Sequence, residues 1–300
     1  MLCLCASALL GGRLHTPGPS VPTATATMPT LNIAGVSVDF PFEPYPVQLV
    51  YMEKVIMALD AGENALLESP TGTGKTLCLL CAALGWRRAE AERIRAATSG
   101  PSGGPRGADW VDKLRAQVAQ PAPDAQPRRV PRVIYASRTH SQLQQVVREL
   151  RRTAHRPLVC LLGSREQMCV HHEVSKLKGA AQSSACAAHV VALSCSYHRR
   201  LKEAKQRAGG TLPHPELGKP EDSRAVPDIE DFVDRSKKDQ LCPFYLSREL
   251  QRESEVLFVP YNYLVESEKR SALNIELARD ILIFDEAHNI ESVRTAGTST

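Results

Sequence analysis

The feature that most constrains this chain is the segment Ser69-Pro-Thr-Gly-Thr-Gly-Lys-Thr76. It follows a strand candidate at residues 64–68 and precedes an apolar run at residues 77–84, which is long enough to form a buried helix. In such a Gly-rich turn, backbone N–H groups can converge on phosphate oxygens at the positive end of the helix. The sequence therefore predicts a strand, a phosphate-binding loop and a helix, in an α/β protein.

The residue types in this loop suit a nucleoside triphosphate. Lys75 is placed to reach the outer phosphates, and the Thr76 hydroxyl is placed to hold Mg²⁺. The usual pattern begins with Gly, whereas this chain has Ser69, so the match fails at its first position. The alternative interpretation is a Gly-rich turn with an exposed lysine. The predicted phosphate-binding residues are Ser69, Pro70, Thr71, Gly72, Thr73, Gly74, Lys75 and Thr76.

A second motif, Asp285-Glu-Ala-His288, follows the apolar strand candidate at residues 281–284. The carboxyl edge of an α/β sheet is where ligands bind. Asp285 would hold Mg²⁺ through water, and Glu286 would polarise the attacking water. Taken alone, these acids could simply begin a helix. Together the motifs predict hydrolysis, with Lys75, Asp285 and Glu286 as catalytic residues, and they argue against a kinase, whose Asp and Asn arrangement is missing.

Further elements and four regions are expected along the chain. Periodicity predicts a helix over residues 47–60, strands at 133–137, 157–162 and 256–259, and a helix from residue 140 with a Thr139–Gln142 capping box. We expect a disordered extension over residues 1–30. Its sequence fits neither a signal peptide nor a transit peptide, and Met28 is an alternative start of the chain. The first part of the main domain covers residues 31–162 with an Ala-, Gly- and Pro-rich insertion at 89–131. A Cys- and His-bearing module covers residues 163–245, and the main domain returns at 246–300.

Composition excludes some classes of protein. With 43% hydrophobic and 23% charged residues, the chain is not a disordered one. No apolar run approaches the ~20 residues that span a bilayer, so we expect a soluble protein without a membrane partner. The net charge of +4 permits an anionic partner without requiring one. Nine cysteines, spread unevenly, indicate reduced thiols or metal ligands rather than a disulfide framework.

Four cysteines in the module sit among polar or small residues, where thiolates suit a metal. They are Cys169, Cys186, Cys195 and Cys242. Their spacing does not match that of ferredoxins. Because histidines lie among them, the residues alone favour Zn²⁺. Those histidines are His171, His172, His189 and His198. No chemistry is assigned to the remaining cysteines, Cys3, Cys5, Cys78, Cys81 and Cys160.

Seven segments in this order resemble a known family: FPFEPYPVQ, ESPTGTGKTLCLL, YASRTHSQLQQV, LGSREQMC, CPFYLSREL, VPYNYL and IFDEAHNIE. The chain resembles the iron–sulfur superfamily 2 DNA helicases, the group that contains the xeroderma pigmentosum D helicase. Within it, TGTGKTLCLLC, YASRTHSQL and GSREQMC resemble the branch that regulates telomere elongation. The resemblance covers about residues 31–291 and leaves out the low-complexity insertions.

The resemblance implies a RecA-like P-loop motor domain with a parallel sheet and an inserted, mainly helical iron–sulfur cluster module. It implies an ATP-driven motor that moves 5′ to 3′ on single-stranded DNA, separates duplex DNA and acts in the nucleus in telomere maintenance and DNA repair, alongside replication, repair or telomere proteins. Gln48 would read adenine, and the DEAH box is Asp285, Glu286, Ala287 and His288. Arg138, Thr139 and His140 would contact DNA, although Arg138 could instead cap its helix or pair with an acid.

The resemblance also makes a 4Fe-4S cluster, rather than zinc, the expected occupant of Cys169, Cys186, Cys195 and Cys242. Because the later helicase motifs are missing, we expect an N-terminal fragment that does not unwind DNA alone. The competing function is a non-catalytic module that binds ATP or single-stranded DNA.

A basic run after Cys195 can be a solvated face or a phosphate contact. It comprises Arg199, Arg200, Lys202, Lys205 and Arg207. Tyr197 and Phe244 could stack on bases or pack in the core.

Overall fold

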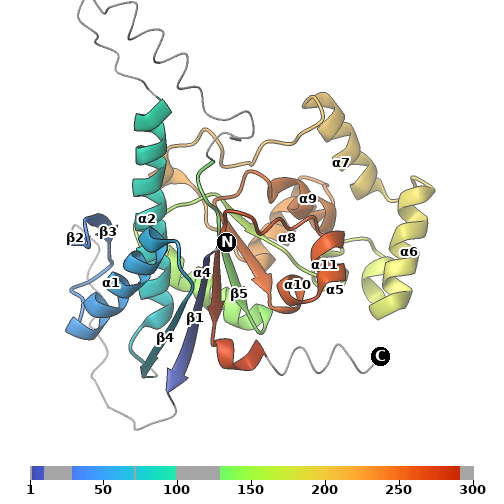
Figure 1. The fold of residues 1–300 in the computed structure, drawn as a ribbon. Coiled ribbons are helices and arrows are strands. Elements are labelled where there is room, and N and C mark those ends of the chain that lie inside the picture. The colour runs from blue at the N-terminus through green and yellow to red at the C-terminus, as the bar shows by residue number, and fades with distance from the viewer. Residues whose placement is uncertain (1, 10–28, 71, 99–128, 291–300) are drawn as a thin grey trace, which may run out of the picture.

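A six-stranded parallel sheet forms the centre of the computed structural model, which describes residues 2–9, 29–70, 72–98 and 129–290. The strand order is β4-β1-β8-β5-β7-β6, and every neighbouring pair is parallel (Figure 1). The strands are β1 Leu2–Leu9, β4 Ala65–Pro70, β5 Val133–Ser137, β6 Val159–Leu161, β7 Val256–Pro260 and β8 Ile281–Asp285. This architecture confirms the α/β prediction and places the carboxyl ends of β4 and β8 at one edge of the sheet.

Strand β1 corrects the expectation of a disordered extension over residues 1–30. Leu2–Leu9 pairs with β4 on one side and with β8 on the other. Its sequence, LCLCASAL, is almost wholly apolar, as an interior strand of a parallel sheet requires. Residues 10–28 lie outside the described part of the chain.

Helices α1 Pro46–Ala61 and α2 Lys75–Thr98 lie on one side of the sheet (Figure 1). The first confirms the helix predicted at residues 47–60 and ends at Gly62, whose φ of 72° is left-handed. The second corrects the start of the predicted insertion, because residues 89–98 continue the helix. Their Ala, Glu and Arg content is strongly helix-forming. The remainder of the insertion at 99–128 is outside the described residues.

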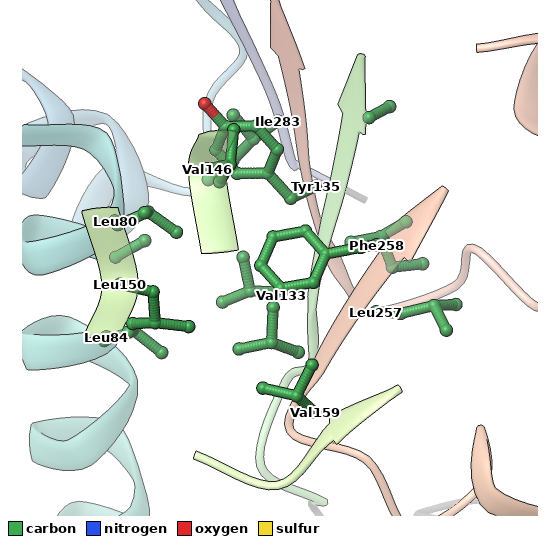
Figure 2. Packing of buried hydrophobic residues seen from close by; sticks show 14 of the residues in the cluster. Leu80, Leu84, Val133, Tyr135, Val146, Leu150, Val159, Leu257, Phe258 and Ile283 are labelled. Atoms are coloured by element: carbon green, nitrogen blue, oxygen red, sulfur yellow. The ribbon is translucent and has the colours of Figure 1, made fainter. Parts of the chain in front are cut away.

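Helix α4 His140–Arg151 has the predicted capping box, in which Thr139 Oγ1 accepts a hydrogen bond from Gln142 N at 3.3 Å. Its apolar face packs with α2 against the sheet, as Figure 2 shows. The residues in this contact are Leu80, Leu84, Val133, Tyr135, Val146, Leu150, Phe258 and Ile283. Burying each large aliphatic side chain there contributes about 1.5–3 kcal/mol.

The module at residues 163–245 is helical, as predicted, and α6 and α7 project away from α1 and α2 (Figure 1). Its elements are α5 Arg165–Met168, η1 Val174–Lys176, α6 Gly179–Val191, α7 Ser196–Arg207, η2 Glu221–Ser223 and α8 Ile229–Lys238. The remaining elements of the described chain are β2 Thr30–Ile33, β3 Val36–Asp39, α9 Pro243–Leu250, α10 Asn262–Val265, α11 Ser267–Ala272 and η3 Ala287–Asn289. None of the described helices combines the length and apolar character needed to cross a bilayer.

One carboxylate ties the module to the main body. Glu255, just before β7, pairs with Arg87 of α2 at 2.7 Å and with Arg224 of the module at 3.2 Å. It also accepts a hydrogen bond from the backbone N–H of Leu158 at 2.8 Å, just before β6. A helix, the sheet and a module loop are therefore held at one point.

Candidate functional site

The two predicted motifs meet at the carboxyl edge of the sheet. The Thr76 hydroxyl donates a hydrogen bond to Asp285 Oδ2 at 3.5 Å, across 209 positions of sequence. Thr76 lies in the first turn of α2, and Asp285 is the last residue of β8. A hydroxyl and a carboxylate facing each other in this way are the oxygen ligands that a protein offers to Mg²⁺.

The phosphate loop is shaped by its glycines and by two hydroxyl groups. Gly72 and Gly74 have φ values of 82° and 76°, in the left-handed region that favours glycine. Thr73 Oγ1 donates to the carbonyl oxygen of Pro70 at 2.9 Å and lies 2.7 Å from Ser69 Oγ. The serine that departs from the usual pattern thus has a local use, because its hydroxyl holds the loop closed. Thr71 is outside the described residues.

Lys75 lies over this loop with only 8% of its surface exposed. Its ammonium group donates to the carbonyl oxygens of Ser69 at 3.2 Å and Pro70 at 3.3 Å. The interpretation of the segment as a turn with an exposed lysine is therefore wrong. A buried cation at the start of a helix is suited to bind phosphate oxygens.

The DEAH residues form the opposite wall. Burial raises the pKa of the Asp285 carboxyl, and the neighbouring Glu286 raises it further. Glu286 has a left-handed backbone with φ 54°, an uncommon conformation for a residue with a side chain. His288 Nδ1 lies 3.5 Å from Glu286 Oε2. DEAH is therefore not the first turn of an α-helix but a sharp bend followed by the short 3₁₀ helix η3.

Gln48 is bound to the phosphate loop. Its Nε2 donates to the carbonyl oxygen of Thr73 at 2.9 Å, and its Oε1 accepts from the backbone N–H of Tyr45 at 2.9 Å. The residue is 4% exposed. In this arrangement the carboxamide supports the loop, which is a role the sequence did not indicate, while its expected contact with adenine stays a prediction.

The segment Arg138-Thr139-His140 stands at the end of β5, beside η3. Arg138 Nη1 donates a hydrogen bond to Asn289 Oδ1 at 3.4 Å. The partner of this guanidinium is therefore a side-chain amide, where the sequence suggested an acid. Thr139 caps α4. Burial lowers the pKa of His140. Their expected contact with DNA stays a prediction.

The four module cysteines line one common cavity: Cys169, Cys186, Cys195 and Cys242. They come from four places in the chain. Cys169 directly follows α5, Cys186 lies within α6, and the other two directly precede α7 and α9. All are free thiols. Cys195 and Cys242 are the N-cap residues of α7 and α9.

The chemistry of this donor set fits a group that carries positive charge. Burial, together with the charge repulsion from Cys195 and Cys186, raises the pKa of Cys242 to about 12. A positively charged group among them would favour the ionised form of Cys242. Within the described ranges, no three His, Cys, Asp or Glu side chains converge closely enough to form a single-ion site. An iron–sulfur cluster needs its thiolates spread around it.

The histidines behave differently from one another. His171, His189 and His198 line the cavity with the cysteines. His171 Nδ1 accepts from the backbone N–H groups of Glu173 and Val174, both at 3.3 Å, so this nitrogen already has partners. His172 is not among the lining residues.

Phe244 is a core residue and not a base-stacking one. It is 4% exposed, and the guanidinium groups of Arg165 and Arg248 lie 4.2 and 3.5 Å from its ring centroid. The protein itself thus supplies two cation–π partners for Phe244. Tyr197 lies in the wall of the cysteine cavity.

Sequence reasoning missed Arg165. Partial burial alone would lower its pKa, but hydrogen bonds with Cys186 and Tyr245 raise it. The available signal was its position within LGSREQMC, four residues before Cys169.

The basic run lies on α7, whose Leu201 is buried. Lys205 pairs with Glu249 at 2.7 Å, and Arg199 lies 3.9 Å from Glu203. Arg200 and Lys202 are exposed. Whether this face binds DNA stays a prediction.

Comparison with known proteins gives concordant matches. The DEAD_2 family model matches residues 135–300, and the DEAD/DEAH box helicase model matches residues 46–192. The regulator of telomere elongation helicase 1 homolog of Oryza sativa subsp. japonica is 46% identical over 274 residues, covering 89% of this chain and 26% of the relative. Regulator of telomere elongation helicase 1 of Homo sapiens is 43% identical over 274 residues, covering 89% and 21%. The chain thus spans about a quarter or less of these relatives.

A solved structure, "XPD_Helicase", matches with a TM-score of 0.50 at 19% identity, covering 85% of this chain and 34% of that one. At this identity the match concerns the fold, and it agrees with the expected RecA-like architecture.

Proposed function

The chain belongs to the DEAD_2 family of XPD-like superfamily 2 helicases, and on that premise we propose that it supplies the nucleotide-binding part of an ATP-dependent DNA helicase. The relatives named for the regulation of telomere elongation support a role in telomere maintenance. We extend the proposal to 5′–3′ movement, DNA repair and a nuclear location, as the resemblance implies.

One observation carries the proposal. The hydroxyl of Thr76 and the carboxylate of Asp285 face each other at 3.5 Å, although they belong to different motifs. A Gly-rich turn or an acidic helix start, each taken alone, gives no reason for this meeting. A shared Mg²⁺-bound triphosphate does.

The residues have separate roles in this proposal. Lys75 would release the loop carbonyls and bind the outer phosphates, while Thr76 and Asp285 would hold Mg²⁺, which supplies charge neutralisation for phosphoryl transfer. Glu286 would accept a proton from the attacking water. Burial raises the pKa of Asp285, and a bound Mg²⁺ would oppose this shift by favouring the ionised carboxylate.

For the module, we propose that Cys169, Cys186, Cys195 and Cys242 hold a 4Fe-4S cluster. When bound, the cluster would supply a redox-active crosslink between the helical segments. Support comes from the shared cavity and from the position of two of the cysteines at helix N-caps. The hydrogen bond between Arg165 and Cys186 would help to orient one ligand.

Phosphate release with and without single-stranded DNA tests the motor function. Lys75→Ala should abolish ATP binding and release, whereas Lys54→Ala, which removes an exposed lysine from α1, should leave both unchanged. Nucleotide binding without any release would favour the non-catalytic module. Anaerobic metal analysis with a visible spectrum tests the cluster, since a colourless, zinc-containing protein would contradict it.

A further inference from the structure

A buried tyrosine hydroxyl lies beside the carboxylate of the DEAH motif. Tyr135 is the central residue of β5 and is fully buried. Its ring packs where the sheet meets α2 and α4, and Figure 2 shows its hydroxyl oxygen in red. Among the residues that the structure describes, this hydroxyl has no hydrogen-bond partner of good geometry. A buried hydroxyl without such a partner costs free energy, so its position requires an explanation.

The strand register places this tyrosine on the same face of the sheet as Asp285. Tyr135 is opposite Ile283 in the pairing of β5 with β8. Side chains alternate between the two faces of a strand, so Ile283 and Asp285 share one face, and Tyr135 lies on it too. Asp285 is two residues further along, about 6.6 Å at the usual rise of a parallel strand. A phenol ring that leans along the strands can therefore bring its hydroxyl to this carboxylate.

The polar groups near the hydroxyl include the two expected metal ligands. The side chains of Asp285 and Thr76 lie within reach of the Tyr135 oxygen. Conversely, Tyr135 is among the groups that act on the Asp285 carboxyl. The contact is at most a weak hydrogen bond, because it falls short of good geometry. Tyr135 thus approaches both side chains that the proposed function assigns to Mg²⁺ and is firmly bound to neither.

A second tyrosine provides a comparison. Tyr51 of α1 also has a buried hydroxyl that lacks a hydrogen-bond partner in the described part of the chain. The charges of Asp285 and Glu286 act on it. Unlike Tyr135, however, it does not approach the Asp285 oxygens closely enough for even a weak hydrogen bond. Of the two hydroxyl groups, that of Tyr135 is therefore the one placed to act on the carboxylate.

Ionisation of Asp285 would strengthen the contact with Tyr135. Hydrogen bonds to a charged acceptor are shorter and roughly twice as strong as those between neutral groups. Carboxylates that bind metal ions are themselves held by hydrogen bonds, and these partners fix their orientation. The Thr76 hydroxyl already contacts Asp285 Oδ2 at 3.5 Å from the side of α2. A donor from β5 would hold the carboxylate from within the sheet.

We propose that Tyr135 is a positioning residue of the nucleotide site, whose hydroxyl donates a hydrogen bond to the Asp285 carboxylate and orients it for Mg²⁺. The inference deepens the proposed function and rests on it. Tyr135 touches no phosphate and no reacting atom. It acts through Asp285, so its contribution belongs to the metal-dependent part of nucleotide binding.

Tyr135→Phe tests the inference, because it removes the hydroxyl and keeps the buried ring. The dissociation constant of a fluorescent ATP analogue in excess Mg²⁺ should rise about tenfold in this variant. The same constant measured in EDTA should stay within about twofold, since the phosphate loop is unchanged. The urea midpoint of unfolding without nucleotide should stay equal or rise, because the deleted hydroxyl has no well-formed hydrogen bond to lose.

Two further variants provide the controls. Tyr51→Phe removes the neighbouring hydroxyl and should leave the constants in Mg²⁺ and in EDTA within about twofold of those of the unmodified chain. In an Asp285→Asn background, Tyr135→Phe should change neither constant further, because the carboxylate through which it acts is absent.

The possible outcomes separate the inference from the proposed function. If Tyr135→Phe binds the Mg²⁺-loaded analogue as tightly as the unmodified chain, the inference fails and the proposed function stands. A rise of equal size in Mg²⁺ and in EDTA, or an effect that persists in the Asp285→Asn background, also overturns the inference, because the hydroxyl then supports the loop and not the carboxylate. If the unmodified chain binds the analogue under neither condition, the proposed function fails and the inference fails with it.

Discussion

Substituting the two loop glycines separates backbone strain from a specific contact. Both Gly72 and Gly74 have left-handed φ values, so an alanine at either position costs roughly 1–2 kcal/mol. A Cβ at Gly72 would meet nothing within 4 Å, whereas one at Gly74 would lie 2.9 Å from Gln48 Nε2. Gln48 could move only by giving up its hydrogen bond to Thr73, which is worth about 0.5–1.5 kcal/mol.

Gly74→Ala should therefore weaken ATP binding more than Gly72→Ala does, by about 1 kcal/mol or a factor of about 5. Titration of a fluorescent ATP analogue with each variant measures this difference. Repeating both titrations in a Gln48→Ala background should remove it, since the contacted group is then absent. Equal affinities for the two single variants, or a difference that persists without Gln48, would refute the reasoning.

Other parts of the chain give further predictions. Asp280→Ala should lower the free energy of unfolding by about 3–5 kcal/mol in urea titrations, because it strips two arginines of a carboxylate whose side chain is 0% exposed. Glu203→Ala, which removes an exposed partner of Arg199, should cost no more than about 1 kcal/mol. Burial alone would raise the pKa of Glu216, but hydrogen bonds from a lysine, a backbone amide and an arginine lower it to about 2. Its stabilising effect should be complete above the ordinary pKa of 4.5 and be lost as the pH falls towards 2, and Glu216→Gln should flatten this part of the stability profile. Cys242→Ser should reduce bound iron and visible absorbance, while Cys81→Ser, buried in α2, should preserve both.

Local patterns in the sequence were sufficient for much of the motor fold. The strand at residues 133–137 was predicted with its observed bounds, because a short, uninterrupted apolar run suits a strand covered on both faces. The start of α4 followed from the Thr139–Gln142 pair, whose hydrogen bonds are local. The approach of Thr76 to Asp285 was predictable for the same reason, since each motif is contiguous and lies at the end of a strand.

Features that depend on distant partners were not predictable in this way. Nothing within residues 2–9 indicates that β4 and β8 leave a place between them, so the segment was interpreted as a disordered extension. Composition misled at residues 89–98, where alanine and charged residues continue α2. The ring of Phe244 is covered in part by Arg165, which lies 79 positions earlier in the chain. The spacing of residues in the sequence shows neither the strand partners of residues 2–9 nor the contact between Arg165 and Phe244.

The carboxylate of Glu255 affects how variants of this chain combine. Arg87, Arg224 and the backbone N–H of Leu158 all share it, so losing one partner changes the environment of the others. Free-energy changes measured for Arg87 and Arg224 variants will not sum to that of the double variant. The stabilities of variants in α2 and in the module loop must therefore be measured together, because their contributions to the free energy of unfolding are not separable at Glu255.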